Sequence, residues 1–256
     1  MVTKNHFGYV RHALRFHRAA LRGGTVAAIG ALAVGMLALT ACGSSSGRDP
    51  LESSSASQVA QQAVTDLKAA PTVTMNGSVS QGGTSYTINL QTKKGTGCTG
   101  TVGEGGKGSL ALVVIGKTVW IKPDTTMWKS FLGGSQASQA IALINGRYLE
   151  SSAKDASSLA SLISLCNPNS LVSGVTTTRD LSKGTITTVN GERVLPLQDK
   201  AHGGTVDVTD ESVPEITELS GNGSGDTGKI VFMEGTPVTV TAPPASQTLS
   251  GSQFGF

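Results

Sequence analysis

The feature that most constrains the fold is a hydrophobic period of two that begins directly after Pro71. Apolar residues or glycine occupy every second position of 73–79, and apolar residues do so again in 86–90. Gly82-Gly83 lies between the two segments and suits a tight turn. Successive side chains of a strand point to opposite faces, so this pattern predicts a β-hairpin with one buried face.

Strand candidates continue through the rest of the chain, separated by turn residues. We predict further strands at 109–115, 118–122, 185–189, 193–196, 205–208, 215–219, 229–233 and 238–241. Segment 109–115 is apolar at nearly every position, which suits a central strand covered on both faces. Asn190-Gly191 is the strongest short hairpin signal in the chain.

Helical periodicity marks a second group of segments. We predict helices at 57–70, 135–145 and 156–165, with a short helical turn after an Asp124 cap. Ser57 is the expected N-cap of the first helix, and Pro71 follows its end. The short turn carries Trp128 and Phe131. These strands, a leading helix and a helical insertion predict one α+β domain over 57–247, followed by a C-terminal tail at 248–256.

The N-terminal region has the pattern of an export signal. An apolar run over 25–41 follows five basic residues and no acidic one. The run ends in Leu39-Thr40-Ala41-Cys42, which resembles the lipobox of bacterial lipoproteins. In such signals the cysteine receives a diacylglycerol and becomes the new N-terminus. A transmembrane anchor is the alternative, but 17 residues diluted by glycine and alanine are short for a span of roughly 20.

This resemblance predicts both the location and the start of the exported chain. Residues 1–41 would be removed as a signal peptide, and Cys42 would anchor the protein by lipid to the extracytoplasmic face of the cell membrane. Residues 42–56 are rich in serine and are expected to form a flexible tether. Five of the 20 basic residues leave with the signal, so 15 remain against 17 acidic ones and the net charge becomes −2. The basic pI of the precursor therefore does not indicate a nucleic-acid partner.

The cysteine count adds a prediction about the exported domain. With Cys42 assigned to the lipid, Cys98 and Cys166 remain as a pair in an oxidising setting. A disulfide is the expected state, and two buried free thiols are the alternative. Closing this 68-residue loop would remove about 4 kcal/mol of unfolded-state entropy.

The sequence offers no enzyme or metal site. His202 is the only histidine left in the exported chain, and no nucleophile motif lies near it. A zinc site lacks paired cysteine spacing, and the acidic residues of 207–218 match no calcium loop. We therefore predict no catalytic residues, no metal and no cofactor.

Several short segments carry a resemblance to a known family. They are the helix at 57–70, the segments 97–102, 118–122, 128–129 and 158–162, and the proline-rich stretch 237–244. Together they resemble actinobacterial envelope lipoproteins of the LppX, LprA, LprF and LprG group, whose fold is LolA-like. The resemblance implies a strongly curved antiparallel sheet, or half-barrel, wrapped over a few helices. It also implies an apolar cavity, which in some members holds acylated glycolipids or other lipids.

The predicted function follows from this resemblance. The exported domain would be a monomer that binds or transfers a lipid or glycolipid in its cavity. The candidate lining residues are Val73, Met75, Val79, Tyr86, Ile88, Leu90, Val114, Trp120, Trp128, Phe131, Ile141 and Leu162. For each of them ordinary core packing is the alternative reading. The alternative function is a lipid-tethered scaffold with a solid core that recruits an envelope protein.

Overall fold

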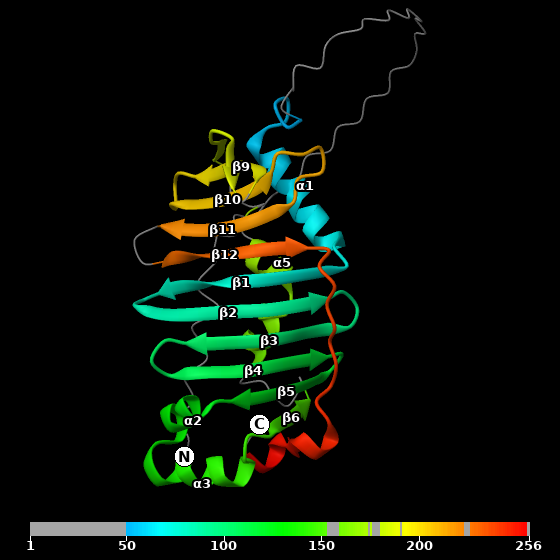
Figure 1. Cartoon of the computed structure of the whole chain (residues 1–256). Coiled ribbons are helices and arrows are strands. Elements are labelled where there is room, and N and C mark those ends of the chain that lie inside the picture. The colour runs from blue at the N-terminus through cyan, green and yellow to red at the C-terminus, as the bar shows by residue number, and fades with distance from the viewer. Residues whose placement is uncertain are drawn as a thin grey trace, which may run out of the picture.

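Thirteen strands in the described part of the chain form a single, strongly curved sheet (Figure 1). The computed structural model describes residues 50–152, 159–173, 175, 180–189, 191–222 and 226–254. The predicted signal peptide, Cys42 and most of the predicted tether lie outside these residues. The sheet order is β13-β6-β5-β4-β3-β2-β1-β12-β11-β10-β9-β7, with β8 paired to β9. The end strands do not pair with each other, so the curved sheet is open, and the predicted fold class is confirmed.

The first half of the sheet is an antiparallel meander. Its strands are β1 (Thr72–Gln81), β2 (Thr84–Lys93), β3 (Gly97–Glu104), β4 (Gly108–Ile115) and β5 (Thr118–Pro123). The predicted hairpin is confirmed as β1 and β2, in which Met75 faces Leu90. Gly82 and Gly83 both have positive φ at its turn, as a tight hairpin connection requires.

The second half returns to the same sheet. Its strands are β7 (Leu181–Lys183), β8 (Thr187–Val189), β9 (Glu192–Asp199), β10 (Gly204–Thr209), β11 (Ile216–Asn222) and β12 (Asp226–Glu234). β12 lies antiparallel beside β1, with Phe232 opposite Met75. The two halves are therefore joined through the β1–β12 pair at the middle of the sheet. At the edge of the sheet beyond β5, β6 (Tyr148–Ser152) pairs with β5 and also, in parallel, with β13 (Thr248–Ser250).

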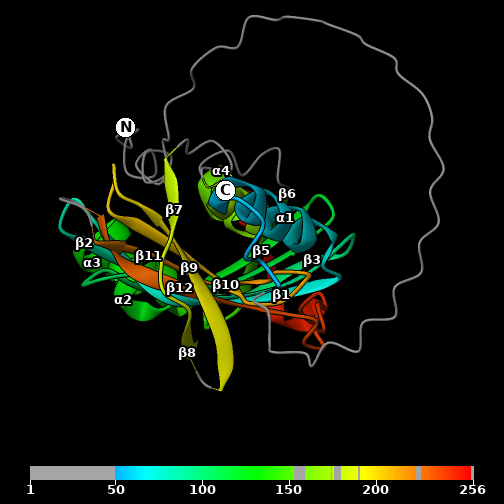
Figure 2. The same cartoon turned by 90° about the horizontal axis from the view of Figure 1, so that it is seen from above.

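Helices lie on the concave side of the sheet and at one of its ends. α1 (Ala56–Ala69), α4 (Ala160–Leu165) and α5 (Pro168–Val172) lie against the concave face, behind the sheet in Figure 1 and above it in Figure 2. α2 (Thr125–Leu132) and α3 (Gly134–Ile144) lie at the end formed by β5 and β6 (Figure 1). α1 begins earlier than predicted: its N-cap is Ser55, not Ser57, because Ser55 and Gln58 form a reciprocal capping box.

The predicted strand at 238–241 is wrong. Residues 235–244 form an extended segment that crosses the convex face, shown in red in Figure 1, and no strand is assigned to it. Pro237, Pro243 and Pro244 lack the N–H groups that a sheet ladder needs. Val238, which belongs to this segment, is nevertheless buried. The alternating apolar residues of this segment therefore reflect its packing against the sheet rather than pairing within the sheet.

Both ends of the predicted domain are more ordered than the sequence suggests. Residues 248–254, assigned to a C-terminal tail, form β13 and a short 3-10 helix. Leu51, assigned to the tether, is buried, and its carbonyl accepts a hydrogen bond from the Lys183 ammonium. The described end of the tether therefore packs against the domain.

Glycines permit the strong curvature of the sheet. Gly100 in β3 has φ +149°, and a Cβ atom added there would lie 2.0 Å from the Asn89 carbonyl oxygen of β2. A Cβ atom on Gly77 would lie 2.1 Å from the Lys229 carbonyl oxygen of β12. At these points neighbouring strands approach too closely for any side chain, so glycine is required.

Asp124 joins α2 to the sheet, and its replacement by alanine should be destabilising. Its carboxylate accepts hydrogen bonds from the Met127 N–H at 2.7 Å and from the Ser109 N–H at 2.8 Å. Burial raises the pKa of Asp124, but these backbone hydrogen bonds outweigh it and leave the pKa below its ordinary value. We expect Asp124→Ala to cost about 1–2 kcal/mol in urea unfolding. Asp124→Asn should cost less, and an unchanged unfolding midpoint in Asp124→Ala would contradict this role of the cap.

Candidate functional site

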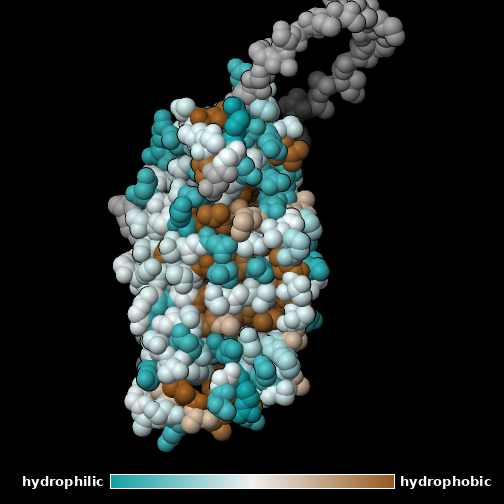
Figure 3. All heavy atoms as spheres, viewed as in Figure 1, coloured by the Kyte–Doolittle hydropathy of each residue, from teal (hydrophilic) through white to brown (hydrophobic). Residues whose placement is uncertain are grey.

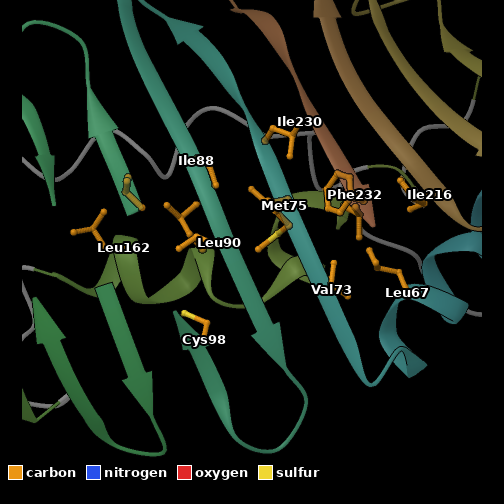
Figure 4. Packing of buried hydrophobic residues seen from close by; sticks show 14 of the residues in the cluster. Leu67, Val73, Met75, Ile88, Leu90, Cys98, Leu162, Ile216, Ile230 and Phe232 are labelled. Atoms are coloured by element: carbon orange, nitrogen blue, oxygen red, sulfur yellow. The ribbon is translucent and has the colours of Figure 1, made fainter. Parts of the chain in front are cut away.

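The concave face of the sheet is the candidate site, because alternate residues of every long strand point into it. The registers place Met75 of β1 between Leu90 of β2 and Phe232 of β12. Figure 4 shows these three side chains together on neighbouring strands. On the next level along the strands, Gly77 lies between Ile88 and Ile230. Apolar positions therefore line up across the strands as well as along them.

Two adjacent rows form a continuous apolar band, which we call the apolar stripe. The first row is Ile121, Leu112, Gly100, Leu90, Met75 and Phe232. The second row is Pro123, Leu110, Val102, Ile88, Gly77, Ile230, Leu219, Val206 and Leu197. The second row crosses nine strands, or roughly 40 Å at the usual strand spacing. The stripe is long, narrow and without a charged residue.

A mixed row and a glycine-rich row border the stripe. On one side lies a row in which only Thr92 and Glu234 are polar, and its members are Val119, Val114, Cys98, Thr92, Val73 and Glu234. On the other side, Tyr86 and Val79 are followed by glycines. That row contains Gly108, Glu104, Tyr86, Val79, Gly228, Gly221 and Gly204. The concave face thus has an apolar stripe, with the polar side chains Thr92 and Glu234 on one side and a row rich in glycine on the other.

Three helices cover the stripe. α1 turns Val59, Ala63, Val64 and Leu67 toward the sheet, and all are buried. α4 and α5 are only six and five residues long and contribute Leu162 and Leu171, among others, to the same core cluster. Such short helices are held by their packing rather than by their own hydrogen bonds.

A disulfide connects this helical layer to the sheet. Cys98 of β3 and Cys166, the C-cap of α4, are bonded, with Cα atoms 5.5 Å apart. The predicted pair is therefore confirmed. The bond fixes the C-terminal end of α4 to the start of β3.

Most of the predicted lining residues lie together on the concave side. Seven belong to the core cluster: Val73, Met75, Ile88, Leu90, Val114, Trp128 and Leu162. Val79 and Ile141 are partly buried against this cluster, and Tyr86 is half-buried in the border row. Met75 and Leu90 are completely buried by the protein itself.

Trp120 and Phe131 do not join the others. Trp120 pairs with Val113, one residue away from the inward-facing Val119 and Ile121, so it lies on the convex face. Its indole N–H donates to the Glu150 carboxylate at 2.9 Å. Phe131 lies on α2 and is exposed rather than packed in the cluster. Aromatic content alone suggested these two residues, whereas the strand period would have placed Trp120 correctly.

Sequence reasoning missed Glu234, which shares the inward level of Val73. Burial, together with the nearby carboxylates Glu215 and Asp66, raises the pKa of Glu234 to about 7. One of its oxygens is buried, with no hydrogen-bond partner among the described residues. Its ordinary acidic identity gave no signal, because only the pairing of β12 with β1 turns it inward.

The raised pKa of Glu234 predicts a pH-dependent stability. The folded state holds this proton more tightly than the unfolded state, where the pKa is near 4.5. Stability from this group is therefore fully present below pH 4.5 and is lost as the pH rises through about 7. We expect a loss of about 1–2 kcal/mol, discounted because the side chain is half-exposed. Glu234→Gln should flatten this slope in thermal unfolding, whereas Glu218→Gln on the convex face should retain it. Equal slopes in wild type and Glu234→Gln would contradict the assignment.

Comparison with solved structures agrees with this geometry. LprF from Mycobacterium bovis aligns over 73% of this chain and 96% of its own chain, with a TM-score of 0.51 and 14% sequence identity. The chain has a LolA-like fold. The lipoprotein LppX from Mycobacterium tuberculosis aligns over 73% of this chain and 98% of its own, with a TM-score of 0.46 and 11% identity. No protein-family model and no curated protein sequence matches the chain.

Within the described ranges no helix is long and apolar enough to cross a membrane. Among the same residues, no group of three or more histidine, cysteine, aspartate or glutamate side chains could hold a metal ion.

Proposed function

We propose that the chain is a membrane-anchored envelope lipoprotein that binds an acyl chain of a lipid along the apolar stripe. The observation that carries this proposal is the stripe itself, an uncharged band that crosses nine strands of a LolA-like sheet. An extended acyl chain fits this shape, and each buried methylene would contribute about 0.8 kcal/mol. The chain would belong to the LppX and LprF group of lipoproteins.

Lipid would bind between the sheet and its helical cover. Because α4 and α5 are short, they can shift from the sheet at a smaller cost than a strand can. The Cys98–Cys166 bond would hold one end of α4 in place while the other side opens. The borders with Tyr86, Thr92 and Glu234 would then face the polar part of the lipid.

Cys42 would keep the protein at the extracytoplasmic face of the cell membrane. A diacylglycerol has two acyl chains, enough for stable attachment where a single chain is marginal. The protein would therefore exchange lipid close to the bilayer, as a carrier or a holding site. This role requires no catalytic residue and no cofactor.

A scaffold with a solid core is the second candidate. The observation in its favour is the complete burial of Met75, Leu90 and Leu112 by the protein alone. In that case the concave face holds only core, and the envelope partner is a protein that binds the outer surface.

Native mass spectrometry and lipid extraction separate the two functions. The full chain carrying Cys42→Ala, purified from bacterial cells, should retain a lipid of defined mass. Leu219→Ser, in a half-buried position of the stripe, should reduce this retention severalfold. Val231→Ser is the matched control, since it is half-buried on the opposite face of β12 and should retain the wild-type amount. Absence of lipid in the chain that carries only Cys42→Ala would favour the scaffold.

A further inference from the structure

The outer surface of the α2–α3 pair carries exposed apolar side chains. Phe131 and Leu132 at the end of α2 are 36% and 39% exposed, and Leu143 near the end of α3 is 62% exposed. Figure 3 shows apolar atoms gathered at the lower end of the molecule, where Figure 1 places these two helices. Three of the six large apolar residues exposed in the described part of the chain therefore belong to this one helical pair.

Each of these side chains keeps 36–62% of its surface exposed, beyond the part that packs on the domain. The inner surface of the pair is formed by Met127, Trp128, Ala137 and Ile144, and all four are buried. The exposed leucines and Phe131 lie outside that surface and keep contact with water. An exposed apolar group of this kind generally marks an interaction surface.

The segment that forms the two helices and the turn after them carries only positive charge. No aspartate or glutamate occurs from residue 125 to 149, while Lys129 and Arg147 lie within this range. The Arg147 guanidinium donates to the carbonyl of Leu143 at 2.8 Å and to that of Ile144 at 3.0 Å. These bonds hold a cation beside the most exposed leucine of the pair.

The nearest acidic residues in the sequence are directed elsewhere. Asp124 accepts hydrogen bonds from the first turn of α2 and from Ser109. Glu150 accepts the indole N–H of Trp120 on the convex face. The outer surface of α2–α3 therefore combines exposed apolar side chains, uncharged serine and glutamine, and two cations.

We propose that the outer surface of the α2–α3 pair docks onto the surface of an anionic lipid bilayer. Apolar side chains would enter the boundary between headgroups and acyl chains, and Lys129 and Arg147 would lie at the level of the phosphates. This second contact would orient the domain, which the Cys42 anchor alone leaves free to rotate. This contact deepens the proposed function. It would place α2, which carries Trp128, and the adjacent end of the sheet next to the bilayer that supplies the lipid.

Hydrogen exchange of the full chain on vesicles tests the contact. Vesicles of phosphatidylcholine with 30% phosphatidylglycerol, a composition chosen for the test, would be compared with detergent-solubilised protein. Amides of α2 and α3 should exchange about tenfold more slowly on the vesicles, the effect expected for burying one leucine, while β1 to β3 stay unchanged. Pure phosphatidylcholine should give a smaller protection, since the attraction to Lys129 and Arg147 is lost.

Leu143→Ser with Phe131→Ser should abolish the protection. Val213→Ser is the matched control, because Val213 is 55% exposed but lies close in sequence to Asp210, Glu211 and Glu215. Unchanged exchange of the α2 and α3 amides on vesicles would overturn the proposal. Protection that appears without lipid and rises with protein concentration would also overturn it, because it would indicate self-association. Lipid retention measured on the same variants tests the proposed function separately. A failure of bilayer docking can therefore be told apart from a failure of lipid binding along the stripe.

Discussion

Replacing Cys98 and Cys166 together with alanine is expected to lower the free energy of unfolding by about 4 kcal/mol. The bond closes a loop of 68 residues, and removing it returns that loop entropy to the unfolded chain. Cys98 is also completely buried, so a small packing loss adds to the effect. For a domain of this size the thermal midpoint should fall by about 10 °C.

Reduction of the wild-type protein is the control for this substitution. Dithiothreitol should lower the thermal midpoint of the wild type and leave that of the double alanine variant unchanged. A double variant as stable as the oxidised wild type would show that the bond contributes little to the fold.

Gly100→Val is expected to cost about 3 kcal/mol or more, which is a large fraction of the stability of a typical domain. The new Cβ would overlap the Asn89 carbonyl oxygen, and a backbone obstacle cannot be relieved by rotating a side chain. The φ of +149° adds strain for any residue with a Cβ. Urea unfolding and the yield of folded protein measure the effect.

Gly82→Ala is the matched control for this position. Gly82 also has a positive φ, but a Cβ there meets nothing within 4 Å. It should therefore cost only about 1 kcal/mol, the conformational penalty alone. Equal losses in the two variants would contradict the close approach of β2 and β3.

Periodicity predicted the parts of the fold in which local pattern and pairing agree. The β1–β2 hairpin, β4, β5 and the helices α1 to α3 follow directly from apolar spacing, turn glycines and the Asp124 cap. β3 carried no such signal, because its glycines and threonines have little apolar content. It is a strand because β2 and β4 pair with it on both sides.

The candidate site was predicted in part for the same reason. The alternation of β1 and β2 identified Met75, Ile88 and Leu90, since one face of a hairpin is set by its period. The contributions of Phe232, Ile230 and Leu219 depend on the pairing of β12 with β1, which joins segments about 150 residues apart in the chain. No local pattern encodes such a pairing, and Glu234 was missed on the same ground.

The fold explains how an open sheet could serve a lipid carrier. Gly77 and Gly100 remove side chains from the middle of the concave face and let the strands bend around it. The disulfide attaches the helical cover at one point. Curvature and a partly fixed cover together would allow the stripe to admit an acyl chain without unfolding the sheet.

Photocrosslinking with a fatty acid that carries a diazirine near its tail tests the central proposal most directly. After the full chain is exposed to this probe and digested, mass spectrometry locates the covalent adducts. Fragmentation of the labelled peptides assigns each adduct to a residue. We expect adducts on Ile88, Leu219 and Ile230, and few on the neighbouring convex residues Thr87, Asn89 and Gln91. Adducts confined to the convex face or to α2–α3, or no adducts at all, would contradict lipid binding along the apolar stripe.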